Sequence, residues 1–208
     1  MNFKNKTIID ISLPIKPGMM VYPGNPAIEF NEASSSSSEL TKITLGSHTG
    51  THLDAPRHSK VSGEGIDTWE LNRFIGPCRV IDVTHENEFI SADTVKSIDP
   101  QPGQRLLFKT KNSLQGFDSW RSDYIYLDGD AAELLSQADI GLFGIDWISV
   151  KQQGNPDNRA HTSLLSKHIP ILEGLDLSAV EPGEYDVIFL PLNLGSLDGG
   201  IGRAVLLQ

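Results

Sequence analysis

A histidine-rich stretch, residues 47–58, carries the residue types best suited to bind a metal ion. It reads S-H-T-G-T-H-L-D-A-P-R-H and contains three of the six histidines of the chain together with one aspartate. His48, His52 and Asp54 are separated by even numbers of residues, so an extended backbone would turn all three side chains to one face. Two imidazoles and a carboxylate on one face are suitable ligands for zinc or a manganese-like ion. The pattern therefore predicts a metal site built on a strand.

The residues around these three side chains fit the same interpretation. Gly50 would leave the face open, and Pro56 would end regular strand pairing, which places His58 on the following loop. The helical H-E-x-x-H pattern of zinc proteases is excluded, because Gly50 and Pro56 disfavour a helix. A single histidine is most often a structural polar group. A structural role explains a cluster of imidazoles and a carboxylate less well, because burying these polar groups costs free energy unless another group pairs with them.

Length and composition limit the class of protein. The chain has 208 residues, of which 38% are hydrophobic and 21% charged, and this predicts one domain over residues 1–208. The formal net charge of −10 disfavours nucleic acid and anionic membranes as partners. We expect no signal peptide and no membrane-spanning segment, because no apolar run is long enough. Cys78 is the single cysteine, so no internal disulfide can form, and we expect a cytoplasmic protein.

Strand and helix patterns alternate along most of the chain. Residues 15–27 are rich in proline and glycine and predict a loop, and Ser91 is a suitable N-cap for a short helix. Strands are predicted at residues 7–13, 40–46, 78–83, 105–109 and 141–147, and a helix at residues 129–138. This order predicts an α/β fold, a mixed β-sheet with helices packed on it.

The second half of the chain offers weaker candidates. Asp146 ends a predicted strand, where a carboxylate most often caps the strand or makes buried hydrogen bonds. His161 and Glu173 lie twelve residues apart, and either alone would be an ordinary structural residue. His85 and His168 lie among polar residues, so we predict surface or structural roles for both.

Two blocks of sequence resemble one family. H-T-G-T-H-L-D-A-P-R-H is followed downstream by G-I-D-x-x-S-V, H-x-x-L-L and I-x-I-L-E-G-L. This order is similar to the cyclase-like metal-dependent hydrolases, which include bacterial kynurenine formamidases and isatin hydrolases. The resemblance covers roughly residues 7–207 and implies the swivelling β/α/β domain of that family.

The resemblance also implies a role for each matching residue. Asp54 would bridge two ions, with His48 and His52 on one ion and His161 and Glu173 on the other. His58 would act as the acid/base, a role that suits an imidazole, which gains and loses a proton near neutral pH. Tyr22 would supply an aromatic contact to the substrate, at a position where kynurenine formamidases carry tryptophan.

The activity implied is hydrolysis of a non-peptide carbon–nitrogen bond by water that a metal ion activates. The substrate would be a small molecule, either an N-formyl arylamine such as N-formylkynurenine, a compound of tryptophan catabolism, or a small cyclic amide. Zn²⁺ is the expected metal, with Mn²⁺ as the alternative and one or two ions per subunit. Relatives imply a homo-oligomer, a dimer or tetramer.

Two other classes of function remain open from the sequence. One is a metal-binding protein of the same fold without activity. The other is a cysteine hydrolase that uses Cys78, but this residue lies in an apolar strand pattern, and buried free cysteines are usually inert.

Overall fold

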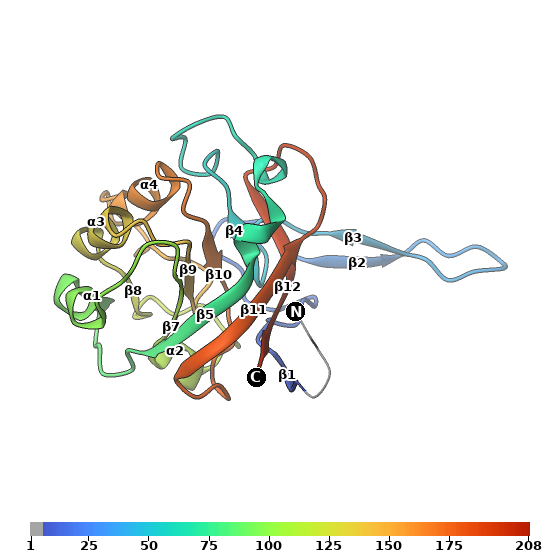
Figure 1. Ribbon diagram of the computed structural model, residues 1–208. Coiled ribbons are helices and arrows are strands. Elements are labelled where there is room, and N and C mark those ends of the chain that lie inside the picture. Colours follow the sequence, from blue (N-terminus) through green and yellow to red (C-terminus); the bar gives the residue numbers. More distant parts are fainter. Residues whose placement is uncertain (1–5) are drawn as a thin grey trace.

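The computed structural model describes residues 6–208, which form a mixed β-sheet with helices packed against it (Figure 1). Residues 1–5, part of the segment in which no signal peptide is predicted, lie outside the described residues. The strands are β1 (Ile8–Asp10), β2 (Glu29–Glu32), β3 (Thr41–Thr44), β4 (His52–Asp54), β5 (Ile75–Asp82), β6 (Phe89–Ile90), β7 (Arg105–Lys109), β8 (Tyr126–Leu127), β9 (Leu142–Ile145), β10 (Ile171–Glu173), β11 (Gly183–Pro191) and β12 (Gly199–Leu207). The helices are α1 (Ala92–Ile98), α2 (Lys111–Gln115), α3 (Gly129–Gln137) and α4 (Arg159–Leu165), with 3₁₀ turns at Ile66–Thr68 and Leu71–Phe74.

The main sheet contains eight strands in the order β1-β12-β11-β5-β7-β9-β10-β4. A further pairing between β12 and β4 closes the strands from β12 to β4 into a barrel-like ring. Neighbours from β5 to β10 run parallel, and the remaining pairs are antiparallel. The prediction of an α/β fold with a mixed sheet is therefore confirmed.

The sheet is buried on both faces where the helices cover it. On β7, Leu106 and Phe108 pack in the cluster formed with α1, α3 and α4. Leu107 points the other way and packs inside the ring with Leu53 and Val187. Burial on both faces explains why the centre of this strand, residues 106–108, is a continuous apolar run rather than an alternating one.

Several local predictions are confirmed. The Ser91 side chain accepts a hydrogen bond from the Thr94 amide at the start of α1. Helix α3 ends at Gln137, within one residue of the predicted boundary. The first strand is shorter than predicted, because regular pairing ends at Asp10 and only an isolated bridge at Ser12 follows.

Other predictions of structural roles hold as well. The Asp146 carboxylate is buried and accepts hydrogen bonds from the Thr110 amide (2.9 Å), the Thr110 hydroxyl (2.7 Å) and the Ser113 amide (3.1 Å). His85 and His168 are exposed. Cys78 is buried in β5 and is not paired.

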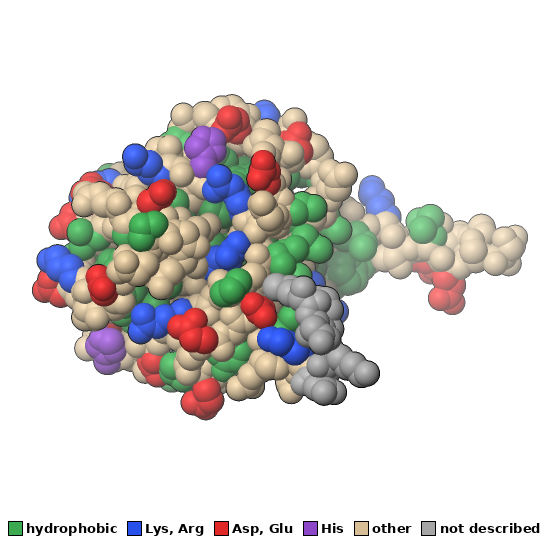
Figure 2. All heavy atoms as spheres, in the orientation of Figure 1, with side chains coloured by type: hydrophobic (Ala, Val, Ile, Leu, Met, Phe, Trp, Pro, Cys, Tyr) green, Lys and Arg blue, Asp and Glu red, His purple; other side chains and the backbone are tan. Residues whose placement is uncertain are grey.

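Strands β2 and β3 form a separate hairpin that projects from the body of the molecule (Figures 1 and 2). Every residue of these two strands is exposed, including Phe30 and Ile43. Among residues 6–208, no helix combines the length and apolar character needed to cross a membrane.

Candidate metal centre and active site

Strand β4 carries His52 and Asp54, which lie between two partner strands. On one side Glu173 of β10 is paired with His52, and on the other side Gly199 of β12 is paired with Asp54. His52 and Asp54 are two residues apart in an extended segment, so they share a face as predicted. Both side chains are almost completely buried. The sheet register therefore brings Glu173, distant in sequence, next to the motif.

His48 reaches the same place from a turn rather than from the strand, so the predicted extended backbone from His48 to Asp54 is wrong. Gly50 has φ of +62°, a left-handed conformation that ends the extended backbone before β4. A Cβ on Gly50 would lie 3.1 Å from the Ile15 side chain. Gly50 is therefore needed for the turn and its packing, and not because it keeps one face of a strand open.

The carboxylates of Asp54 and Glu173 face three imidazoles at short range. Asp54 Oδ1 lies 2.9 Å from His48 Nδ1 and 3.6 Å from His52 Nε2. Glu173 Oε2 lies 3.2 Å from His52 Nε2. His161, on α4, places Nε2 3.5 Å from Asp54 Oδ2 and 4.0 Å from Glu173 Oε1. All five predicted ligands are thus brought together.

Several buried atoms at the centre of this cluster have no hydrogen-bond partner among residues 6–208, and they indicate whether a cation fits the site. His52 Nδ1 lies 2.9 Å from the Gly50 carbonyl, which can only accept, so Nδ1 holds the proton and Nε2 of the neutral ring has a free lone pair. Within residues 6–208, His52 Nε2 and both oxygens of Asp54 have no hydrogen-bond partner, although they are buried. Buried acceptors that face one another are costly unless a positive group lies between them. A divalent cation would satisfy all of them, and nitrogen and oxygen donors suit zinc, manganese and iron.

Potential ligand atoms group differently from the pairs that the resemblance implies. His48, Asp54 and His58 form one group, and His52, Asp54 and Glu173 form another, with the ligand atoms of each group within 4.8 Å of one another. Asp54 belongs to both groups, as a bridging carboxylate would. His58, predicted as the acid/base, lies with its ring centroid 4.1 Å from that of His48.

Asp198 is a member of the site that the sequence analysis missed. Its Oδ2 lies 3.2 Å from His48 Nε2 and 3.9 Å from His58 Nδ1, and its Oδ1 accepts a hydrogen bond of 2.8 Å from the Ser47 hydroxyl. The hydrogen bond with His48 holds the pKa of Asp198 well below its usual range. The residue precedes Gly199 at the start of β12, and no motif spacing links it to residues 47–58. Only the pairing of β12 with β4 places it there.

The charge state of the imidazoles depends on these neighbours. Burial opposes a positive charge on His48, but the hydrogen bond to Asp198 and the nearby carboxylate of Asp54 raise its pKa to about 10. Burial lowers the pKa of His161, against the opposing effect of Asp54 and Glu173, while nearby His58 and Lys151 lower it further. A cation bound by His48 would therefore compete with a proton.

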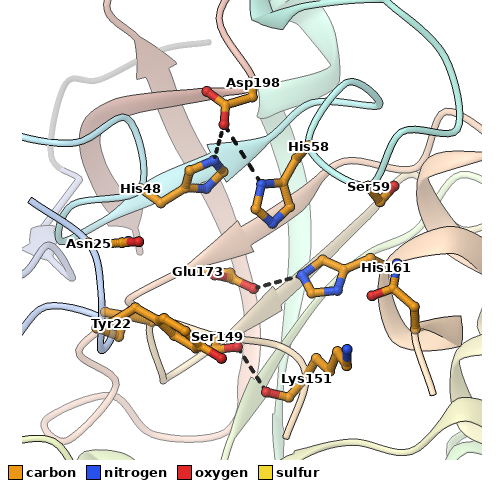
Figure 3. Close-up of a pocket in the computed structure, with 12 residues that line it drawn as sticks. Tyr22, Asn25, His48, His58, Ser59, Ser149, Lys151, His161, Glu173 and Asp198 are labelled. Atoms are coloured by element: carbon orange, nitrogen blue, oxygen red, sulfur yellow. Dashed lines mark hydrogen bonds and ion pairs between the residues drawn. The ribbon is translucent and has the colours of Figure 1, made fainter. Parts of the chain in front are cut away.

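The cluster opens into a pocket of about 370 Å³ (Figure 3). His48, His58, His161, Glu173 and Asp198 line it together with Tyr22, Asn25, Ser59, Ile148, Ser149, Lys151 and Asn158. Tyr22 comes from the predicted loop, and its ring packs edge-on against Trp120 with centroids 5.0 Å apart. This volume is suitable for a small organic molecule. An accessible pocket beside buried donors is typical of a catalytic site rather than of a closed structural metal site.

Fold and site together define an enzyme of the hydrolase class, and the comparisons identify its family. The cyclase family model matches residues 9–152, so the chain belongs to the cyclase family. It is 35% identical to the kynurenine formamidase of Salinibacter ruber over 204 residues, covering 96% of each protein.

Solved structures of similar proteins have the same fold. A structure described as a potential metal-dependent hydrolase with cyclase activity matches with a TM-score of 0.88 and 34% identity, covering 97% of this chain and 98% of that chain. An isatin hydrolase bound to the product analogue thioisatinate has the same fold, with a TM-score of 0.85 and 23% identity over 99% of this chain and 93% of that one.

Proposed function

We propose that this protein hydrolyses a small, non-peptide amide with a divalent metal held by His48, His52, Asp54, His161 and Glu173. The observation that carries the proposal is the unpartnered Nε2 of His52, which faces the carboxylates of Asp54 and Glu173 in a buried site. Histidine and carboxylate ligands beside a pocket leave room for a water molecule and a substrate. When bound, the metal lowers the pKa of water and polarises the carbonyl of the substrate.

His58 is the proposed acid/base. Its side chain is about one-third exposed to the pocket, at 34%, whereas the proposed ligand His52 is fully buried. An imidazole at the pocket wall can accept a proton from the attacking water and return it to the leaving nitrogen. Asp198, 3.9 Å from His58 Nδ1, can orient the ring during this transfer.

The proposed substrate is an N-formyl arylamine, with N-formylkynurenine as the first compound to test. The support is the relative named kynurenine formamidase, which is similar over almost the entire chain. Tyr22, packed against Trp120 in the pocket wall, offers an aromatic surface to an aryl group. A small cyclic amide is the alternative substrate.

The identity of the metal and the number of ions per subunit are also proposed. Zn²⁺ is the proposed metal, and Mn²⁺ is the alternative, because both accept imidazole and carboxylate ligands. Two ions per subunit would explain why Asp54 takes part in both groups of potential ligands, and one ion would require only one of these groups.

Assembly, domain organisation and location are proposed on separate grounds. A homodimer or tetramer is supported by the β2–β3 hairpin, because an isolated two-stranded hairpin is marginally stable in water and this one exposes Phe30, Leu40 and Ile43. One domain is supported by the pairing of β1 with β12, which joins the first and last strands. A cytoplasmic location is supported by the single, buried Cys78.

The test is hydrolysis of N-formylkynurenine by protein loaded with Zn²⁺ or Mn²⁺, followed as release of kynurenine. His58→Ala should lower kcat by about 10²- to 10⁴-fold while metal content is unchanged. His85→Ala changes an exposed histidine outside the site and is the matched control. If the metal-loaded protein hydrolyses neither formamides nor cyclic amides, the proposed function is wrong.

A further inference from the structure

Lys151 places a primary ammonium group in the pocket wall, and the reaction outlined above does not use it. Its backbone is held firmly. The Lys151 carbonyl accepts hydrogen bonds from the Ser149 hydroxyl (2.8 Å) and from the Tyr124 hydroxyl. The preceding amide, on Val150, donates a hydrogen bond to Oε1 of the proposed ligand Glu173. The backbone next to Lys151 is thus hydrogen-bonded directly to one of the proposed metal ligands.

The ammonium of Lys151 is near Asp157 but is not paired with it. Over residues 6–208, no hydrogen bond or ion pair involves its Nζ atom, although the residue is half-buried. Acidic groups around the pocket already have other partners. Asp157 pairs with Arg159 at 2.8 Å, Glu173 accepts a hydrogen bond from the Val150 amide, and Asp198 pairs with Ser47 and His48.

The pocket therefore has two chemically different ends. Imidazoles and carboxylates gather around His48 and Asp198, whereas Tyr22, Ser149 and Lys151 lie on the other side of Glu173 and His161 in Figure 3. The other polar lining residues are neutral: the amides Asn25 and Asn158 and the hydroxyl of Ser59. An amide side chain and an ammonium group are good donors to an anion. The protein as a whole carries a net charge of −10 and would repel an anion elsewhere.

We propose that Lys151 binds a carboxylate of the substrate, on the part of the molecule remote from the amide that is cleaved. This inference rests on the proposed function and narrows it to amides that carry a carboxylate. N-formylkynurenine meets the requirement, because its amino-acid portion has a free carboxylate beyond the aryl ketone. A cyclic amide without an acidic group does not. Lys151 is thus a specificity residue rather than a catalytic one.

The experiment compares matched ligands that differ only in this charge. L-kynurenine and L-kynurenine carboxamide share the aryl group and the amino group, and their dissociation constants are measured by calorimetry with the metal-loaded protein. The variants are Lys151→Met, Lys151→Arg and, as the control for net charge, Lys167→Met, which changes an exposed lysine outside the pocket. The values of kcat/KM are measured in parallel for the N-formyl derivatives of both compounds.

Lys151→Met should weaken binding of kynurenine by about 10- to 100-fold, the loss expected for one charge-assisted contact. Binding of the carboxamide should change by less than about twofold, because the remaining contacts persist. Lys151→Arg should restore part of the loss, and Lys167→Met should have no effect.

Equal effects of Lys151→Met on both ligands would overturn the inference. So would a wild-type protein that binds kynurenine no better than its carboxamide. The proposed function fails separately, if kynurenine binds but neither N-formyl compound is hydrolysed. Binding and turnover thus give distinct answers for the lysine and for the reaction.

Discussion

Gly199 limits the space around His48, and its replacement tests how the site is assembled. A Cβ built on Gly199 would lie 2.7 Å from His48 Cε1 and 3.0 Å from Nε2. Carbon atoms in contact are normally about 3.5–4.0 Å apart, so the added methyl group is about 1 Å too close. The His48 ring cannot turn away freely, because Asp54 and Asp198 hold its two nitrogens.

Gly199→Ala should therefore displace the imidazole from Asp54. Overpacking of this kind costs about 1–3 kcal/mol, and a misplaced ligand or its support lowers metal affinity by about 10- to 100-fold. The assay is competition for Zn²⁺ between the protein and a chromophoric chelator, with thermal unfolding measured alongside.

Gly195→Ala is the matched control, because Gly195 lies four residues earlier, in the loop before β12, where a Cβ meets nothing within 4 Å. The control should bind Zn²⁺ as the wild type does. If Gly199→Ala also binds Zn²⁺ with unchanged affinity, His48 is not held as described or does not bind the metal.

Three further predictions concern residues at and away from the metal. Burial raises the pKa of Cys78 to about 12, so the thiol is a poor nucleophile and Cys78→Ser should retain full activity. A thiol reagent at neutral pH should modify Cys78 only when the protein is unfolded. Loss of activity in the variant would favour a cysteine nucleophile. Partial burial opposes ionisation of Glu86, but the hydrogen bonds from Thr94 and Ser91 together outweigh it and lower the pKa of Glu86 below the ordinary 4.5. Ionised Glu86 therefore stabilises the fold above pH 4.5, and this contribution is lost as the pH falls through the lower folded-state pKa. When the pH is lowered from 4.5, the unfolding temperature of Glu86→Gln should decline less steeply than that of the wild type. Asp198→Asn should lower metal affinity by about tenfold by weakening the support of His48, as measured with the chelator; an unchanged affinity would show that the contact has no such role.

The sequence is most informative where local rules and side-chain chemistry agree. Residues 106–108 are an apolar run, and they form the centre of strand β7, which is buried on both faces. Ser91 caps α1 because its hydroxyl can reach the Thr94 amide from the residue before the helix. His52 and Asp54 share a face because the side-chain period of a strand is two residues.

Long-range pairing and backbone dihedral angles are not visible in a single sequence. Asp198 enters the site only because β12 closes the ring against β4, and a loop aspartate before two glycines has no spacing that signals this. The alternation from His48 to Asp54 predicted one strand, but a positive φ at Gly50 could not be distinguished from an open strand position. Lys151 likewise looks like any surface lysine until Glu173 fixes the backbone beside it.

The most direct test of the central claim is the metal content of freshly purified protein. Wild type, His52→Ala and the control His85→Ala are compared by elemental analysis, with circular dichroism to verify that each is folded. Wild type and control should contain one or two equivalents of a transition metal per chain, and His52→Ala should lose it, because the buried His52 Nε2 has no hydrogen-bond partner among residues 6–208 and faces two carboxylates. A wild-type protein that holds no metal, and takes up none from added Zn²⁺ or Mn²⁺, would contradict the account.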